Sequence, residues 1–225
     1  MLSACNMPIP YHREGNSSTL GTSTTVLLLP AFVLIEDVTP ASVPELITNH
    51  INNASTNVTP LVNPSTGTSN MAADDLSQSS SILRVRACPH RYLILLCSQK
   101  TRDARCGQSA PLLRKEFERH LRPLGLYRDL HDERPGGVGI YFISHMGGHK
   151  FAANCFIYRR ADGTSTSDDG IVPGSGEASQ CIWLARIRPE DCENIVRYTV
   201  LQGKVVKPDR QLRGGFDRAR QLVSW

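Results

Sequence analysis

The sequence predicts an α/β fold with a central mixed sheet, and three observations lead to this class. Continuous apolar runs at 92–98 (YLILLCS) and 138–145 (VGIYFISH) are typical of strands buried on both faces. Residues 110–125, between them, carry leucine and phenylalanine at helical spacing and end in glycine. Beyond them, two more strands and a last helix are predicted over 153–160, 181–187 and 188–203.

The order of these elements is strand, helix, strand, strand, strand, helix, which resembles a reduced thioredoxin-like fold. We assign it to residues 82–225. Residues 52–81 are rich in Ser, Thr, Asn and Pro and poor in large apolar side chains, so we expect a disordered linker. Residues 1–51 are expected to form a short segment of two strands and a helix that is truncated at its start.

Charge is unevenly distributed along the chain. Residues 1–81 carry one basic and six acidic residues, whereas residues 82–225 carry 24 basic and 15 acidic ones. The basic residues alternate with acids and do not flank an aromatic platform, so we expect no nucleic-acid binding. The longest apolar run, VLLLPAFVLI, has ten residues including a proline, and it predicts neither a membrane span nor a signal peptide.

Seven cysteines are present, and none belongs to a C-x-x-C motif. An odd number at irregular spacing does not indicate a disulfide framework, and the missing C-x-x-C weighs against a dithiol oxidoreductase. The sequence also lacks the nucleophile elbow, P-loop and dinucleotide motifs, so it does not indicate an enzyme.

Two pairs of candidate ligands follow the predicted strands. Cys97 ends the first strand, and Cys106 follows with eight residues between them, before the predicted helix. His145 ends the second strand, and His149 follows a Gly-Gly turn. The carboxyl ends of parallel strands meet at one sheet edge, so the four side chains should converge. Two thiolates and two imidazoles suit zinc or an iron–sulfur cluster, and the wide cysteine loop favours a two-iron cluster with histidines on one iron.

The C-x8-C and H-x3-H motifs, together with LRGG at 212–215 and VLLLPAF near the start, resemble the fungal sucrase/ferredoxin-like family. This resemblance implies a thioredoxin-like [2Fe-2S] ferredoxin domain, with Cys97, Cys106, His145 and His149 as cluster ligands. It also implies a soluble electron-transfer protein. No motif encodes the electron donor, for which we expect a reductase. A zinc-stabilised module with the same ligands and a metal-free thioredoxin-like redox sensor remain as alternatives.

Other cysteines and histidines have less specific surroundings. Cys88 and His90, in ACPH, could resemble a metal-ligand pair without belonging to the site. His120 and His131 are interpreted as surface residues. Core positions are predicted for Cys155, Cys181 and Cys192.

The sequence ends in Val-Ser-Trp, which resembles the tail by which some iron–sulfur proteins recruit the cytosolic cluster-assembly machinery. A terminal carboxylate beside an indole offers one charged and one apolar anchor for such capture. We therefore expect Trp225 to contact that machinery and the protein to be cytoplasmic, with the mitochondrion as the alternative compartment.

Overall fold

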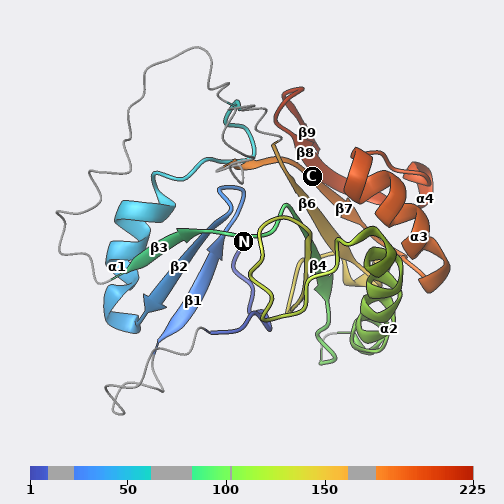
Figure 1. The fold of residues 1–225 in the computed structure, drawn as a ribbon, viewed down its shortest axis with the longest axis horizontal. Coiled ribbons are helices and arrows are strands. Elements are labelled where there is room, and N and C mark those ends of the chain that lie inside the picture. Colours follow the sequence, from blue (N-terminus) through green and yellow to red (C-terminus); the bar gives the residue numbers. More distant parts are fainter. Residues whose placement is uncertain (10–22, 62–82, 102, 162–175, 225) are drawn as a thin grey trace.

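The computed structural model describes residues 1–9, 23–61, 83–101, 103–161 and 176–224. Two sheets organise these residues (Figure 1), a three-stranded sheet of order β1-β2-β3 and a six-stranded sheet of order β5-β4-β6-β7-β8-β9. The predicted α/β class with a central mixed sheet is confirmed. Most of the linker predicted over 52–81, and also Trp225, lie outside the described residues.

The small sheet consists of β1 (Thr24–Leu28), β2 (Val33–Val38) and β3 (Arg84–Ala87), all antiparallel. The first two strands and the helical segment after them match the prediction; that segment comprises Pro40–Ser42, α1 (Val43–Glu45) and Leu46–Ile51. The third strand lies in the stretch assigned to the larger domain. The two parts of the sequence therefore share a sheet, through the pairing of β2 with β3.

In the main sheet, β4 (Tyr92–Cys97) pairs in parallel with β5 (Val138–Ile143) and antiparallel with β6 (Cys155–Arg160). The crossover between β4 and β5 contains helix α2 (Ala104–Leu121) and a 3-10 turn, Arg122–Leu124. The remaining strand of the predicted set is β7 (Ala178–Leu184). A helical stretch follows, made of Pro189–Asp191, α3 (Cys192–Asn194) and Ile195–Val200, and then α4 (Pro208–Gln211).

The two faces of the main sheet have different neighbours. Alternate residues of β4, such as Ile94 and Leu96, pack with Phe117 of α2 and Val196 of the last helical stretch. The remaining residues of β4 point to the opposite face of the main sheet, where they pack with Phe32 and Leu34 of the small-sheet region. Figure 1 shows this arrangement, with helices α2 and α3 on one side of the main sheet and the small sheet with α1 on the other.

Helix α2 begins six residues earlier than predicted. Pro111, which would be the second residue of the predicted helix, lies well inside the observed one. The start is set by Asp103, whose carboxylate accepts a hydrogen bond from the Arg105 backbone N–H (2.9 Å). Cys106, predicted to precede the helix, consequently lies in its first turn.

Two strands, β8 (Leu212–Asp217) and β9 (Leu222–Ser224), were not predicted. They contain the LRGG motif, and glycines argue against a strand when only the sequence is read. At Gly215, φ is 141° and a Cβ atom would lie 2.1 Å from the Cys181 carbonyl oxygen. Glycine is therefore needed there because β8 approaches β7 closely.

None of the helices in the described part of the chain is both long and apolar enough to cross a bilayer.

Candidate metal centre

The site lies at the carboxyl edge of the parallel strands β4 and β5. Their register pairs Cys97 with Ile143, and the Ser98 N–H donates to the Ile143 carbonyl (3.0 Å). His145 follows two residues after Ile143, so it lies beyond the same edge of the sheet. The backbone at both strand ends therefore lies at one edge of the sheet, and the convergence of all four side chains stays a prediction.

Cys97 and Cys106 lie side by side. One comes from the end of β4 and the other from the first turn of α2, and both are buried, at 1% and 0% exposure. Their sulfur atoms share a hydrogen bond, which lowers the pKa of the Cys97 thiol to about 7 and raises that of Cys106. The pair therefore loses its first proton more readily than an ordinary thiol does, and its second proton less readily. The structure brings together the two thiols that the sequence proposed as a pair.

Backbone groups also point at the Cys97 sulfur. The contact with Cys106 lowers the pKa of Cys97 most. Hydrogen bonds from the backbone N–H groups of Gln99 and Met146 lower it further. The second of these comes from the residue next to His145. A thiolate at position 97 therefore receives hydrogen bonds from both flanking loops, which is an environment that suits a metal-bound sulfur.

Asn154 holds the loop that carries the predicted histidines. Its Nδ2 donates to the Gly148 carbonyl (3.1 Å), and its Oδ1 accepts from Trp183 Nε1 (3.2 Å). Its own carbonyl accepts the Cys97 N–H (3.1 Å), and the residue is 1% exposed. Gly148 has a φ of 63°, and a Cβ there would lie 2.7 Å from the Trp183 ring. The sequence analysis missed Asn154, whose only local signal is a polar residue just before an apolar strand.

The N-terminal residues add a further segment along the free side of β5. Backbone bonds join the Ser144 N–H to the Ala4 carbonyl (2.8 Å) and the Asn6 N–H to the Phe142 carbonyl (3.2 Å). The Ser3 hydroxyl accepts the N–H of His145 (3.1 Å). The loop that carries His145 and His149 is called the histidine loop below. Residues 3–6 thus hold its start from the edge of β5 that faces away from β4.

The predicted histidine ligands remain predictions. His145 is half-buried just past β5, and the backbone of His149 begins a 3-10 turn, His149–Phe151, whereas the His149 side chain lies outside what the structure describes. Within the described side chains, no three His, Cys, Asp or Glu residues form a group that could hold a metal ion.

The Cys88 and His90 pair lies at the opposite, amino end of β4. His90 Nε2 is 2.9 Å from the Tyr141 hydroxyl, and both side chains are buried. Burial, followed by the nearby Arg128 charge, lowers the pKa of His90 to about 4, and burial raises the pKa of Cys88. These are core residues, as are Cys155, Cys181 and Cys192, which are at most 1% exposed.

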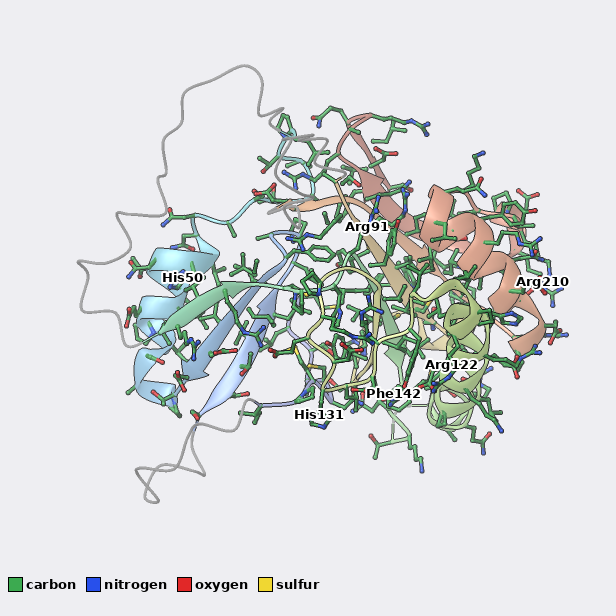
Figure 2. All side chains as sticks on the ribbon, in the orientation of Figure 1. His50, Arg91, Arg122, His131, Phe142 and Arg210 are labelled. Carbon is green, nitrogen blue, oxygen red and sulfur yellow. The ribbon has the colours of Figure 1, made fainter. Side chains whose placement is uncertain are left out.

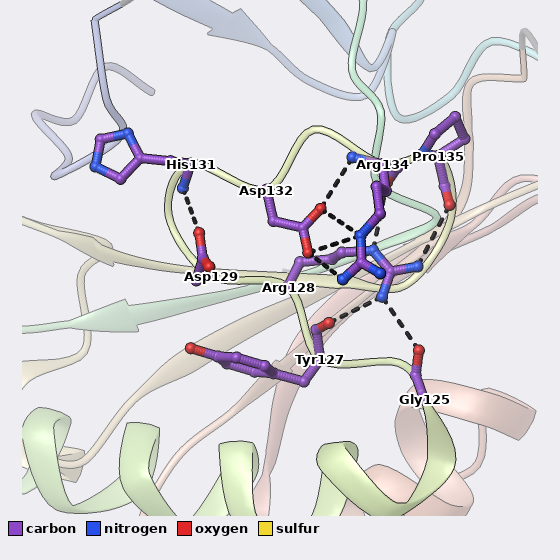
Figure 3. Close-up of polar contacts among 8 residues, drawn as sticks. All are labelled: Gly125, Tyr127, Arg128, Asp129, His131, Asp132, Arg134 and Pro135. Carbon is purple, nitrogen blue, oxygen red and sulfur yellow. Dashed lines mark hydrogen bonds and ion pairs between the residues drawn. The ribbon is translucent and has the colours of Figure 1, made fainter.

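A loop with its own hydrogen-bond network covers this amino end (Figure 3). The Arg128 guanidinium donates to the carbonyls of Gly125 (3.1 Å) and Tyr127 (2.8 Å), and Asp132 pairs with Arg134 (2.5 Å). The loop is tied to the residues just before β4 through the Gly136 N–H, which donates to the Pro89 carbonyl (2.9 Å). Beneath it, a cavity of about 140 Å³ reaches the small sheet; its lining includes Met7, Thr25, Leu34, His90, Leu130 and Tyr141.

Comparison with known proteins gives one family. The sucrase/ferredoxin-like family model matches residues 1–214. Actin patches distal protein 1 of Saccharomyces cerevisiae is 32% identical over 188 residues, covering 84% of this chain and 50% of that protein. Altered inheritance of mitochondria protein 32 of Debaryomyces hansenii is 36% identical over 115 residues, covering 51% of this chain and 33% of that protein.

A second protein named altered inheritance of mitochondria protein 32, from Clavispora lusitaniae, is 32% identical over 118 residues, covering 52% of this chain and 33% of that protein. The aligned region amounts to about half the length of the Saccharomyces relative and about a third of the other two. No solved structure matches the chain. With a family model aligned over nearly its whole length, the chain belongs to the sucrase/ferredoxin-like family.

Proposed function

We propose that this protein binds a [2Fe-2S] cluster at the carboxyl edge of β4 and β5 and serves in electron transfer. The observation that supports it is the placement of Cys97 and Cys106 side by side, next to the loop that carries His145 and His149. Two thiolates on one tetrahedral metal ion lie about 3.8 Å apart, a separation comparable with that of hydrogen-bonded sulfurs. The donor set of two thiols and two imidazoles also fits a cluster with mixed ligation.

In this proposal Cys97 and Cys106 hold one iron, and His145 and His149 hold the other. The bound cluster supplies a one-electron redox couple, with a potential above that of an all-cysteine ferredoxin because imidazole is neutral. The backbone N–H groups of Gln99 and Met146 would stabilise the negative charge on the Cys97 sulfur. Asn154 would hold the loop of both histidines in place through its hydrogen bond to the Gly148 carbonyl.

Two alternatives use the same residues. A zinc ion with the same four ligands would make this edge a structural module. Without a metal, the hydrogen-bonded thiol pair could act as a redox sensor, since the pKa of Cys97 is lowered to about 7 and thiolates are the reactive form.

One experiment separates the three functions. Protein purified without oxygen is analysed by visible absorption and for iron, acid-labile sulfide and zinc. Iron and sulfide in equal amounts in a coloured protein support the cluster, zinc in a colourless protein supports the module, and absence of metal supports the sensor.

The cysteine ligands are tested by substitution. Cys97→Ala and Cys106→Ala should each lose the iron and the visible absorption, because each removes one of the two thiolates on the same iron. Cys155→Ala is the matched control, since Cys155 pairs with Leu96 in the sheet and packs on its other face. Full iron content in Cys97→Ala would remove this residue from the ligand set.

The histidine ligands are tested by the reduction potential. His145→Cys and His149→Cys should keep a cluster but lower its potential, because a thiolate replaces a neutral imidazole. His131→Cys, at an exposed position of another loop, is the control. An unchanged potential in both ligand variants would assign the second iron to other residues.

The compartment and partners belong to the same proposal. We propose the cytoplasm, with the mitochondrion as the alternative, and a reductase as electron donor. Mitochondrial inheritance appears in the names of the relatives and is said of those proteins. Cell fractionation with the native protein detected by antibody would decide between the compartments.

A further inference from the structure

Three cationic side chains surround one phenylalanine next to the histidine loop. The ring of Phe151 has the guanidinium carbons of Arg213 at 4.1 Å and Arg186 at 5.1 Å from its centroid, and the Lys150 ammonium at 5.0 Å. Each contact is a cation–π interaction, and such contacts contribute about 0.5–2 kcal/mol apiece. Lys150, Arg186 and Arg213 are called the cation cluster below.

The charges of the cation cluster are close enough to act together. Since all three lie within about 5 Å of one ring centroid, no two of these charged groups are more than about 10 Å apart, roughly one Debye length at 0.1 M salt. Their fields therefore add at the protein surface. Like charges repel at this range, so the arrangement costs free energy in the isolated protein.

The cation cluster has no carboxylate partner within the described part of the chain. Among the residues that the structure describes, none of its three members forms an ion pair, and Arg213 Nε has no hydrogen-bond acceptor. Neighbouring acids are already engaged elsewhere: Glu190 pairs with Arg188 (3.6 Å), and the buried Asp191 pairs with Lys207 (2.5 Å). The positive charge is thus available to a partner.

Position connects the cation cluster to the proposed metal centre. Phe151 lies two residues after His149, and its carbonyl accepts the Arg186 N–H (3.0 Å). Arg186 and Lys150 are exposed. Arg213 donates to the Arg210 carbonyl (3.1 Å), and Figure 2 shows Arg210 at the rim of the molecule on the side of α3 and α4. The cluster therefore lies on an accessible surface that adjoins the end of the histidine loop.

We propose that the cation cluster is the docking surface for a redox protein with an acidic face. This inference rests on the proposed function, because it assigns the partner class for the same site. Charge complementarity orients such a partner and accelerates its association. Docking at residues 150, 186 and 213 would bring the partner beside the loop of His145 and His149, where an electron would enter or leave.

The test uses an acidic flavodoxin as the probe and measures its binding by flavin fluorescence anisotropy at low ionic strength. Binding to the purified full-length protein should be saturable and should weaken steeply with added sodium chloride. Lys150→Glu combined with Arg186→Glu should raise the Kd by about tenfold or more. The control combines Lys204→Glu with Lys115→Glu, which makes the same charge change at two exposed lysines outside the cluster. Its Kd should stay within about threefold of the wild-type value.

Equal losses of affinity in the two double variants would overturn the docking surface, since total charge would then explain binding. Competition by inorganic phosphate beyond that of chloride at equal ionic strength would overturn it in favour of a small-anion site. Lys150→Glu alone, with circular dichroism of every variant, separates lost docking from lost folding. The anisotropy follows the flavodoxin flavin, so it reports on docking whether or not iron and sulfide are found in the protein.

Discussion

The two ends of strand β4 carry the same residue types and use them differently. At the amino end, Cys88 and His90 pack into the core, and the imidazole contacts the Tyr141 hydroxyl (2.9 Å). At the carboxyl end, Cys97 faces Cys106 and receives hydrogen bonds from loop backbone. Burial dominates at the first end, where it disfavours charge, whereas hydrogen bonding at the second favours a thiolate.

Strand direction thus decides whether a cysteine or histidine at a strand end is held neutral in the core or is stabilised as a possible ligand. At the carboxyl edge, a helix start and the end of a neighbouring parallel strand meet, and both present backbone N–H groups. At the amino edge, Arg128 and Asp132 make hydrogen bonds within the covering loop. The following experiments test that difference, starting with the largest expected effect.

Acidification should destabilise the protein through His90. Its pKa is lowered to about 4 in the folded protein, mainly by burial, and is about 6.5 in the unfolded chain. Between these values the unfolded chain binds more protons, so the free energy of unfolding rises with pH and is lost as pH falls from about 6.5 to about 4. The loss should approach about 3 kcal/mol.

The measurement is urea unfolding at several pH values, compared with His90→Gln, which keeps a polar side chain but does not titrate. Other titrating groups contribute equally to both proteins and cancel in the difference. The same pH dependence in His90→Gln as in the wild type would show that His90 is not the buried neutral group described above.

Gly139→Ala should destabilise the amino end by steric overlap. An added Cβ would lie 2.5 Å from the His90 ring, and the site is buried. We expect a loss of about 2 kcal/mol in the free energy of unfolding. In the background of His90→Ala the same change should cost much less, because the ring is gone. Equal costs in both backgrounds would place the strain elsewhere.

At the carboxyl end, Asn154→Ala should lower the free energy of unfolding by about 1–2 kcal/mol. It removes the partners of the Gly148 carbonyl and of Trp183 Nε1. Amide hydrogen exchange in residues 145–149 should accelerate at the same time. Asn53→Ala is the control, since this exposed asparagine also donates to two backbone carbonyls. Unchanged exchange in the loop would contradict the positioning role of Asn154.

The smallest effect is expected from Ser3→Ala. The change removes the hydroxyl that accepts the His145 N–H, at a partly exposed site, and should cost about 0.5–1 kcal/mol. Protection of the His145 amide against hydrogen exchange should fall selectively, while the amides of central strand β6 keep theirs. Full protection at His145 would show that residues 3–6 do not hold the loop.

Elements with a local pattern of residues could be predicted before the structure was known. Buried strands such as β4 and β5 were predicted because a run of apolar side chains is enough to indicate them. The pairing of Cys97 with Cys106 also followed from the sequence, since both residues flank one predicted strand-to-helix connection. Core positions for Cys155, Cys181 and Cys192 followed from their apolar neighbours and are confirmed.

The other features could not be predicted, because they depend on contacts between residues that are distant in the sequence. Helix α2 starts at Ala104 because a carboxylate caps it, six residues before the start predicted from apolar spacing. Strand β8 forms through a glycine that lets it approach β7. The hydrogen bonds by which Asn154 and Ser3 hold the histidine loop could not be predicted, because the register of the sheet brings their partners beside them. Hydrogen bonds between strands depend on register, and register is set by the packing of the whole sheet.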